Sequence, residues 1–302
     1  MLLFKQNENG LSSLNEKPFK LEKEIQRLFE QNLAVISDYQ LIKSEFSIKN
    51  SRIDTLVFDP ENNAFVIIEY KRSQNFSVVD QGISYLNLML ENKGEFIVEY
   101  YESSLPKLKR DEFDWSQSKV IFVSPAFTDF QNQAANFKDL PIELWEIHQF
   151  EKGIVSVVPL KKSKSAPSFK QIKTAQNADL EKVVDEIKAY SEQEHLENKN
   201  DEIRELYEQF KEAILRLDTE LDPKALKHYI AFKKGKKNLA YIKIQHNSLK
   251  IFINLKKGTL NDPKNITEDV SEKGHHGTGD YQIIVKDSRD VEYIMSLIKQ
   301  TI

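Results

Sequence analysis

Two apolar runs joined by a short turn, with charged residues among the apolar ones, constrain the fold of this chain more than any other feature. The runs span residues 52–59 and 64–71. Pro60 and Asn63 lie between them, and both favour a turn because proline fixes φ and asparagine tolerates the left-handed region. The pattern predicts two antiparallel strands joined by a four-residue loop, with Asp59 paired to Ala64.

This pairing places Asp54 opposite Glu69, with Lys71 two residues further along the second strand. Directly opposed residues have their Cβ atoms about 5 Å apart. Side chains alternate along a strand, so all three charged residues share one face with apolar neighbours. The other face is also apolar, which predicts a hairpin covered on both sides. The alternative is a surface hairpin with solvated charges and an incidental salt bridge.

Two opposed carboxylates repel each other, and without a cation the pKa of one of them rises. A hard divalent cation removes this conflict, and Mg²⁺ is commonly held by one or two carboxylates together with water and substrate phosphate. A lysine beside such a site can orient or activate the attacking water, or stabilise charge developing on the phosphate. Asp54, Glu69 and Lys71 therefore favour a Mg²⁺ site over a structural ion pair.

Asp54, followed after the hairpin by Glu69-Tyr70-Lys71, resembles the core of the PD-(D/E)xK nucleases, and residues 52–72 look like the catalytic domain of NucS-type endonucleases. The resemblance implies an α/β fold with a restriction-endonuclease-like mixed sheet flanked by helices. It also implies a Mg²⁺-dependent endonuclease acting on nucleic acid, with Mn²⁺ as a substitute and DNA as the expected substrate. Asp54, Glu69 and the Tyr70 carbonyl would bind the metal, and Lys71 would act on the water.

Residues 21–33 predict an amphipathic helix, because apolar side chains recur there at helical spacing. At about 100° per residue, Glu22 falls inside the apolar sector, and a glutamate on a buried stripe needs a partner. A first-helix glutamate often completes the metal site in PD-(D/E)xK nucleases, so the resemblance makes Glu22 a third acidic candidate. The alternative places it at the edge of the stripe, in water. Arg52 and Arg72 flank the site and are expected to contact phosphates.

Residues 78–90 predict a second helix, on which Gln81 and Tyr85 lie four apart and share a face. This is similar to the Q-x-x-x-Y motif that follows the E-x-K strand in RecB-like nucleases, where it lies beside the active site and helps to position DNA. The alternative packs Tyr85 in the core and leaves Gln81 on the surface. Strand-like runs then follow at residues 95–100, 119–123, 142–147 and 153–158, which suits a mixed α/β sheet.

The length of 302 residues predicts about two domains, and hydrophobic residues make up 40% of the chain, enough for real cores. Residues 161–168 are polar, basic and interrupted by proline, so we expect a nuclease-like domain at 1–160, a linker and helix at 161–195, and a smaller α+β domain at 196–302. The absence of cysteine excludes disulfides and zinc–thiolate sites. No signal-peptide core or membrane span is evident, so we expect a cytoplasmic protein. A homodimer is compatible with this class of enzyme.

The second half contains a basic segment, residues 223–260, with ten lysines and no acidic residue. Two strands are predicted within it, joined by a two-residue turn at Asn247-Ser248 that pairs Ile244 with Ile251. Lys243, Lys250 and Phe252 would then lie on one face, where lysines attract phosphate and an exposed aromatic ring can stack on bases. The alternative is a hairpin whose lysines protect its outer face while a helix covers Tyr241 and Phe252.

The C-terminal part resembles a domain of unknown function that accompanies such nucleases, in proteins once labelled predicted transport proteins. A glycine-rich loop there carries His275 and His276, but adjacent histidines point in different directions and are poor chelators. Two other functions stay open. One is a nucleic-acid-binding protein on a nuclease scaffold that does not cut, and the other is an interaction factor whose lysine-rich hairpin contacts an acidic partner.

Overall fold

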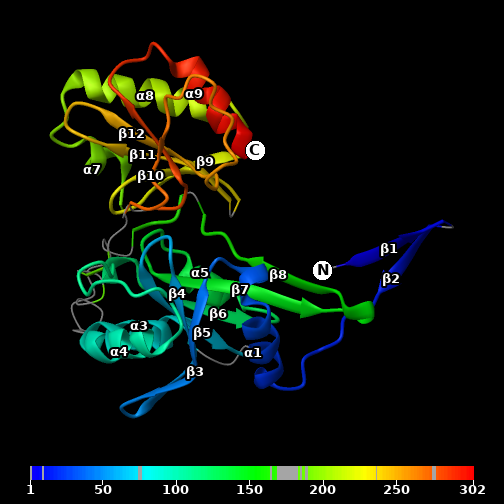
Figure 1. Cartoon of the computed structure of the whole chain (residues 1–302). Helices are drawn as coiled ribbons and strands as arrows, with labels where there is room; N and C mark the ends of the chain where they lie inside the picture. Colours follow the sequence, from blue (N-terminus) through cyan, green and yellow to red (C-terminus); the bar gives the residue numbers. More distant parts are fainter. Residues whose placement is uncertain are drawn as a thin grey trace. The chain divides into compact units, whose positions relative to one another are not determined.

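The computed structural model describes residues 2–8, 10–73, 77–163, 165–168, 183, 186–187, 190–235, 237–273 and 277–302. The chain divides into two units, Met1–Ala189 and Tyr190–Ile302, each built around a six-stranded sheet (Figure 1). The boundaries expected at residues 160 and 196 stay a prediction, and much of the expected linker helix lies outside the described residues. Val183 and Ile187 pack in the core of the first unit.

The sheet of the first unit is mixed, as the sequence predicted. Its strand order is β3-β4-β5-β6-β7-β8. The pairs β3–β4, β4–β5 and β7–β8 are antiparallel, whereas β5–β6 and β6–β7 are parallel. The strands span Gln40–Ile48 (β3), Ser51–Asp59 (β4), Ala64–Tyr70 (β5), Lys119–Ser124 (β6), Ile142–Gln149 (β7) and Val155–Pro159 (β8).

Helices cover both faces of this sheet, so the hairpin of β4 and β5 is buried on both sides as predicted. Helices α3 (Val78–Glu91), α4 (Lys93–Glu102) and α5 (Asp129–Ala135) contribute to the core on one face. Helix α1 (Glu22–Gln31) and the short α2 (Leu33–Ile36) pack on the other. Alternation decides which side chains meet which helices: Leu56 and Ile67 face α3, whereas Val57 and Ile68 face α1.

The β4–β5 hairpin has the predicted register. Asp59 pairs with Ala64 and Leu56 with Ile67, and the regular ladder ends at Thr55 and Ile68. The turn is stabilised by Asp59, whose Oδ1 accepts a hydrogen bond of 3.0 Å from the backbone N–H of Glu61. Asn63 takes the left-handed conformation, with φ of 51°.

One predicted strand is wrong, because residues 95–100 belong to helix α4. Their buried side chains are Phe96, Ile97 and Tyr100, a spacing that places them on one helical face against the core. A short apolar run of this kind does not distinguish a buried helix from a strand by periodicity alone. Lys93 and Gly94 begin the helix without a side-chain cap.

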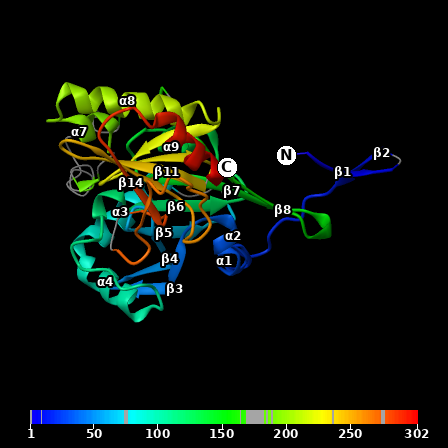
Figure 2. The same cartoon turned by 45° about the horizontal axis from the view of Figure 1, so that its top comes forward.

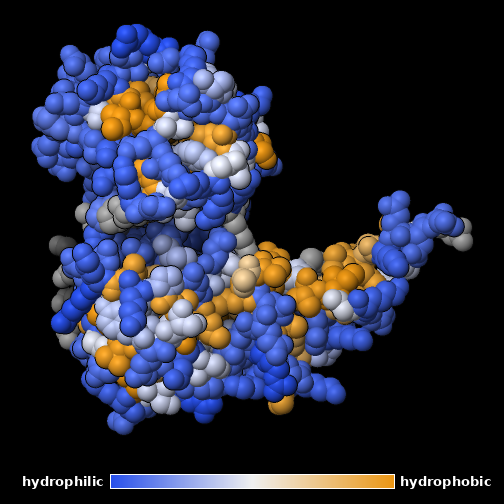
Figure 3. All heavy atoms as spheres, viewed as in Figure 1, coloured by the Kyte–Doolittle hydropathy of each residue, from blue (hydrophilic) through white to orange (hydrophobic). Residues whose placement is uncertain are grey.

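The chain begins with a two-stranded hairpin, β1 (Leu3–Asn7) and β2 (Gly10–Leu14), which extends away from the sheet of the first unit in both cartoon views (Figures 1 and 2). It is joined to the end of β7 by a bridge between Glu16 and Phe150. Figure 3 shows apolar side chains gathered near β8 and at the base of the hairpin, whereas the outer part of the hairpin is hydrophilic. The exposed apolar residues of these elements include Phe4, Leu11 and Val155. Two strands alone are marginally stable in water.

The second unit contains an antiparallel sheet of order β13-β14-β12-β11-β10-β9. Two helices, α8 (Asp201–Leu215) and α9 (Val291–Ile298), pack on one face of it, and the short α7 (Glu192–Leu196) precedes them. The strands span Leu221–Ala225 (β9), Ile230–Lys234 (β10), Lys237–Ile244 (β11), Leu249–Ile253 (β12), Glu268–Asp269 (β13) and Tyr281–Val285 (β14).

The β11–β12 hairpin corrects two predictions. Ile244 pairs with Leu249 instead of Ile251, because four residues form the connection instead of two. The shift of two keeps every side chain on its predicted face. Phe252 is buried and its ring is stacked on that of Tyr241, with centroids 4.5 Å apart, in a small cluster on the side away from α8 and α9. Phe252 therefore cannot stack on bases. His275 and His276 lie outside the described residues.

Candidate active site

Two carboxylates meet where β4 leaves its regular pairing with β5. The next pair after Thr55 and Ile68 would be Asp54 and Glu69, and here Oδ2 of Asp54 accepts a hydrogen bond of 3.0 Å from the backbone N–H of Tyr70. Glu69 is only 4% exposed. It faces α3, on the same side of the sheet as Leu56 and Ile67, as alternation predicted.

Glu69 uses only one of its carboxylate oxygens. Its Oε1 accepts hydrogen bonds from Nζ of Lys71 at 2.8 Å and from Nε2 of Gln81 at 3.1 Å. Its Oε2 is buried and has no hydrogen-bond partner among the described residues. A buried carboxylate oxygen without a donor is energetically costly. The arrangement leaves this oxygen free to bind a cation.

The surroundings of Asp54 favour the protonated form of its carboxyl group and so raise its pKa. Burial raises the pKa of the Asp54 carboxyl to about 6, and the negative charge of Glu69 contributes in the same direction. The Tyr70 N–H and the positive charge of Lys71 act against this rise in pKa. A divalent cation between the two carboxylates would reverse the balance, because it favours the charged form of both.

Helix α3 supplies the polar side chains above Glu69. Ser77 caps its N-terminus by accepting a hydrogen bond from the N–H of Asp80. Gln81 bonds to Glu69 and also donates to the Tyr85 hydroxyl at 3.2 Å, while that hydroxyl donates to the carbonyl of Arg52 at 3.3 Å. Burial and then the charge of Glu69 raise the pKa of the Tyr85 hydroxyl. The sequence-predicted pair Gln81 and Tyr85 therefore lies at the carboxylates.

Glu22 does not lie where the sequence placed it. Its side chain is exposed, so the expectation of a glutamate on the buried stripe is wrong. Oε1 of Glu22 accepts a hydrogen bond of 2.9 Å from the backbone N–H of Arg72, just beyond Lys71. The buried face of α1 is formed instead by Ile25, Gln26 and Phe29.

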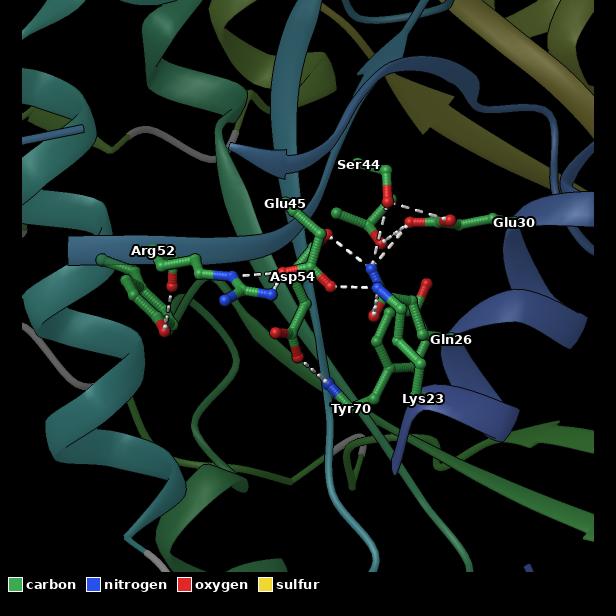
Figure 4. A network of polar contacts seen from close by, with 10 residues as sticks. Lys23, Gln26, Glu30, Ser44, Glu45, Arg52, Asp54 and Tyr70 are labelled. Carbon is green, nitrogen blue, oxygen red and sulfur yellow. Dashed lines mark hydrogen bonds and ion pairs between the residues drawn. The ribbon is translucent and has the colours of Figure 1, made fainter. Parts of the chain in front are cut away.

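Gln26 is a contributor that sequence reasoning missed. Its Nε2 donates to the carbonyl of Asp54 at 2.8 Å, to Oγ of Ser44 at 3.2 Å and to Glu30 at 3.0 Å (Figure 4). Thr55 also donates to Glu30, at 2.5 Å. These bonds hold the backbone of β4 next to Asp54. The sequence signal that could have identified Gln26 is its position on the apolar face of the helix, next to Ile25 and three residues before Phe29.

The two arginines differ in how they are held. Arg52 forms an ion pair with Glu45, which also pairs with Lys23, as Figure 4 shows. The guanidinium of Arg72 donates to the carbonyl of Lys20 at 2.7 Å. The side chains of both arginines are exposed, and in the sequence each lies within three residues of one of the two carboxylates. Lys243 and Lys250 belong to the second unit, where they face each other directly across β11 and β12.

The donor set fits a hard cation such as Mg²⁺ with few protein ligands. Within the described residues, no group of three or more His, Cys, Asp or Glu side chains is gathered to hold a metal. Mg²⁺ needs only one or two carboxylates, because waters and substrate phosphate complete its octahedral shell. A divalent cation at this place would give the Oε2 of Glu69 a partner and would favour the charged form of Asp54, whose pKa is raised.

Over its full length, the chain is 58% identical to an "Uncharacterized protein" of Haemophilus influenzae strain Rd, covering 99% of that protein. The chain belongs to the same family as this Haemophilus protein. Residues 192–301 match the family model DUF5655, a domain of unknown function. Within the described residues, no helix is both long and apolar enough to cross a membrane.

Three solved structures share weaker similarity with the chain. A repair endonuclease from Pyrococcus abyssi is 20% identical with a TM-score of 0.29, and the match covers 44% of this chain and half of that one. EndoMS in an EndoMS–dsDNA2 complex is 19% identical with a TM-score of 0.29, covering 48% and 64%. SfsA of Pyrococcus furiosus in complex with Ca²⁺ is 13% identical with a TM-score of 0.25, covering 50% and 78%.

Proposed function

We propose that this protein is a metal-dependent endonuclease that hydrolyses phosphodiester bonds in nucleic acid, with DNA as the expected substrate. The observation that carries the proposal is the pair Asp54 and Glu69, which converge from adjacent strands and leave a buried carboxylate oxygen without a donor. Lys71 contacts the other oxygen of Glu69. A purely structural pair of acids would gain nothing from this arrangement, because both charges are partly desolvated.

Asp54, Glu69 and the Tyr70 carbonyl would hold the metal. The N–H and C=O of a strand residue point to the same side, so the Tyr70 carbonyl is directed toward the strand edge at which its N–H meets Asp54. When bound, Mg²⁺ supplies a lowered pKa for a coordinated water and neutralises charge on the phosphate oxygens. Mn²⁺ prefers similar oxygen ligands and should substitute.

The remaining residues position the reacting groups. Glu69 keeps the Lys71 ammonium beside the carboxylates, where it can donate a hydrogen bond to the attacking water or to a phosphate oxygen. Gln81 fixes the rotamer of Glu69, and Tyr85 fixes Gln81. Glu22 would position Lys71 indirectly, because its carboxylate accepts a hydrogen bond from the backbone N–H of Arg72, the next residue.

Phosphate contacts are proposed at Arg52 and Arg72, and further contacts at Lys243 and Lys250 in the second unit. Like charges directly opposed across two strands are destabilising unless an anion lies between them. The pair Lys243 and Lys250 has this arrangement. Phe252 has no place in this proposal because it is buried.

The test is cleavage of plasmid and labelled oligonucleotide substrates in Mg²⁺ or Mn²⁺. We expect Asp54→Asn and Lys71→Met to lower the rate at least a hundredfold, with thermal denaturation showing that each variant folds. Glu95→Gln and Lys109→Met remove exposed charges elsewhere in the first unit and should leave the rate unchanged. Full activity of Asp54→Asn would refute the proposed role.

A non-cleaving nucleic-acid-binding protein on this scaffold is the second candidate. The exposed position of Glu22 favours this second function. Among the described residues, Asp54 and Glu69 have no third acidic side chain beside them to complete a metal site. Salt-sensitive binding of DNA or RNA by the wild-type protein, without cleavage in either metal, would identify this function instead.

A further inference from the structure

A recess lies on the α1 side of the first unit, the face of the sheet opposite to Glu69, and Arg72, the residue that follows Lys71, forms part of its wall. It is formed by the segment before α1, by α1 itself, by the end of β7 and by the residue that follows Lys71. We call it the α1 recess, and its lining consists of Lys17, Pro18, Phe19, Lys20, Glu24, Arg27, Leu28, Gln31, Arg72 and Gln149. The proposed mechanism uses only Arg72 from this set.

The α1 recess gathers an excess of positive charge. Lys17, Lys20, Arg27 and Arg72 line it, and none of them forms an ion pair with another described residue. The acid in the lining, Glu24, uses its Oε2 to accept a hydrogen bond of 2.8 Å from the backbone N–H of Lys20. Four cations and one carboxylate around one hollow leave a net positive charge, and the resulting potential attracts an anion.

Three apolar residues also line the α1 recess. Phe19 is buried, Leu28 is partly buried and Pro18 is exposed. Pro18 and Leu28 offer accessible apolar surface for a sugar, while phosphates can reach the surrounding cations. The side chains of Gln31 and Gln149 add hydrogen-bond donors.

Arg72 connects the α1 recess to the carboxylates. It directly follows Lys71, its N–H is held by Glu22 and its guanidinium is held by the carbonyl of Lys20. A phosphate bound at Arg72 would therefore lie next along a strand that passes Lys71. The two glutamates near this point, Glu22 and Glu24, are each engaged by a backbone N–H.

We infer that the α1 recess binds the phosphate backbone of the nucleic-acid strand that runs past Lys71, one or a few nucleotides from the cleaved bond. This inference rests on the proposed function for its substrate class. It assigns a strand-holding role to Lys17 and Arg27, two residues that lie outside the catalytic set.

The experiment measures binding of a fluorescein-labelled single-stranded oligonucleotide by fluorescence anisotropy over a range of salt concentrations. The protein carries Asp54→Asn and is kept in EDTA, so that cleavage cannot interfere. Loss of two phosphate contacts in Lys17→Gln/Arg27→Gln should lower the slope of log K against log salt by about 1.4. Affinity at 0.1 M salt should fall roughly tenfold or more.

The matched control is Lys107→Gln/Arg110→Gln, which removes the same two charge types from exposed positions of the same unit. A slope change equal to that of the control would overturn the inference. Failure of the two proposals is distinguishable. Binding that depends on Lys17 and Arg27, without any cleavage by the wild-type protein, would support strand binding at the α1 recess and reject the nuclease function. Cleavage by the wild-type protein, together with an unchanged salt slope in Lys17→Gln/Arg27→Gln, would support the nuclease function and reject strand binding at the α1 recess.

Discussion

Asp54 and Tyr70 are joined by a hydrogen bond of 3.0 Å, from the backbone N–H of Tyr70 to a carboxylate oxygen of Asp54. In a regular hairpin a strand N–H bonds to a backbone carbonyl. Here a side chain takes that place, so Asp54 is fixed at the edge of β5 next to Glu69. The cost of this placement is the raised pKa of Asp54, and several predictions depend on it.

Asp54→Asn should stabilise the metal-free protein at neutral pH. The folded-state pKa of Asp54 is about 6, above the ordinary value of 3.8, so the folded state binds the proton more tightly than the unfolded state. Stability is therefore lost as pH rises from about 4 to about 6 and stays lower above that window. Asparagine mimics the protonated form and still accepts the Tyr70 hydrogen bond. After allowance for solvent screening, we expect a gain of about 1–3 kcal/mol.

Urea denaturation in EDTA at pH 4.5 and pH 7.5 measures this effect. The variant should gain stability relative to the wild type mainly at the higher pH. Asp111→Asn, an exposed acid of the same unit, should show no such pH-dependent gain. A loss of stability in Asp54→Asn at pH 7.5 would mean that the Asp54 carboxylate is not destabilised by burial and by Glu69.

Metal affinity should weaken as pH falls below about 6. In the proposed function Mg²⁺ would bind the ionised form of Asp54, whose pKa is raised to about 6, so protons and metal would compete for the same group. We expect the apparent dissociation constant for Mn²⁺ to rise roughly tenfold per pH unit below this value. Calorimetric titration of Mn²⁺ between pH 5 and pH 8 tests this, and it should also detect proton release. Affinity that does not change over this range would contradict binding at Asp54.

The hairpin register and the convergence of Asp54, Glu69 and Lys71 could be predicted from sequence because they depend on local rules. A turn sets the register, and alternation sets the face. The contact of Gln81 with Glu69 was expected only from the family resemblance. Its physical basis is that α3 follows β5 directly and packs back on the face that carries Glu69.

Features that depend on distant segments were not predictable in this way. The rotation of α1 about its axis is decided by contacts with β3 and β4, so Gln26 lies inward and Glu22 outward. Phe252 lies on a face with two lysines, which suggested exposure, yet loop residues Leu226 and Val270 pack in the same cluster. Covering by loops leaves no periodic signal in the strand itself.

Gln81→Ala should reduce the cleavage rate more than Tyr85→Phe does. Gln81 donates directly to the Glu69 carboxylate, and a hydrogen bond to a charged group contributes about 1.5–3 kcal/mol. Without this hydrogen bond the Glu69 carboxylate would no longer be held in the orientation that the reaction needs. We therefore expect kcat to fall roughly 10- to 100-fold. Tyr85→Phe keeps the ring and removes a hydroxyl one step further away, so a few-fold loss is expected. Equal rates for Gln81→Ala and wild type in saturating Mg²⁺ would rule out this positioning role.

Gly82→Ala should push α3 away from the sheet and thereby disturb Gln81. A Cβ at Gly82 would lie 2.4 Å from Cδ1 and 2.9 Å from Cγ1 of Ile142 in β7, too close for any real contact. Overpacking of this kind costs about 1–3 kcal/mol, while alanine returns up to about 1 kcal/mol through its helix propensity. We expect a net loss of stability together with reduced cleavage. Adding Ile142→Val removes the Cδ1 methyl, so the double variant should recover part of both losses, as urea denaturation and cleavage assays would show. Ile142→Val alone should be mildly destabilising through its small cavity, which makes rescue in the double variant specific to the steric conflict between these two positions.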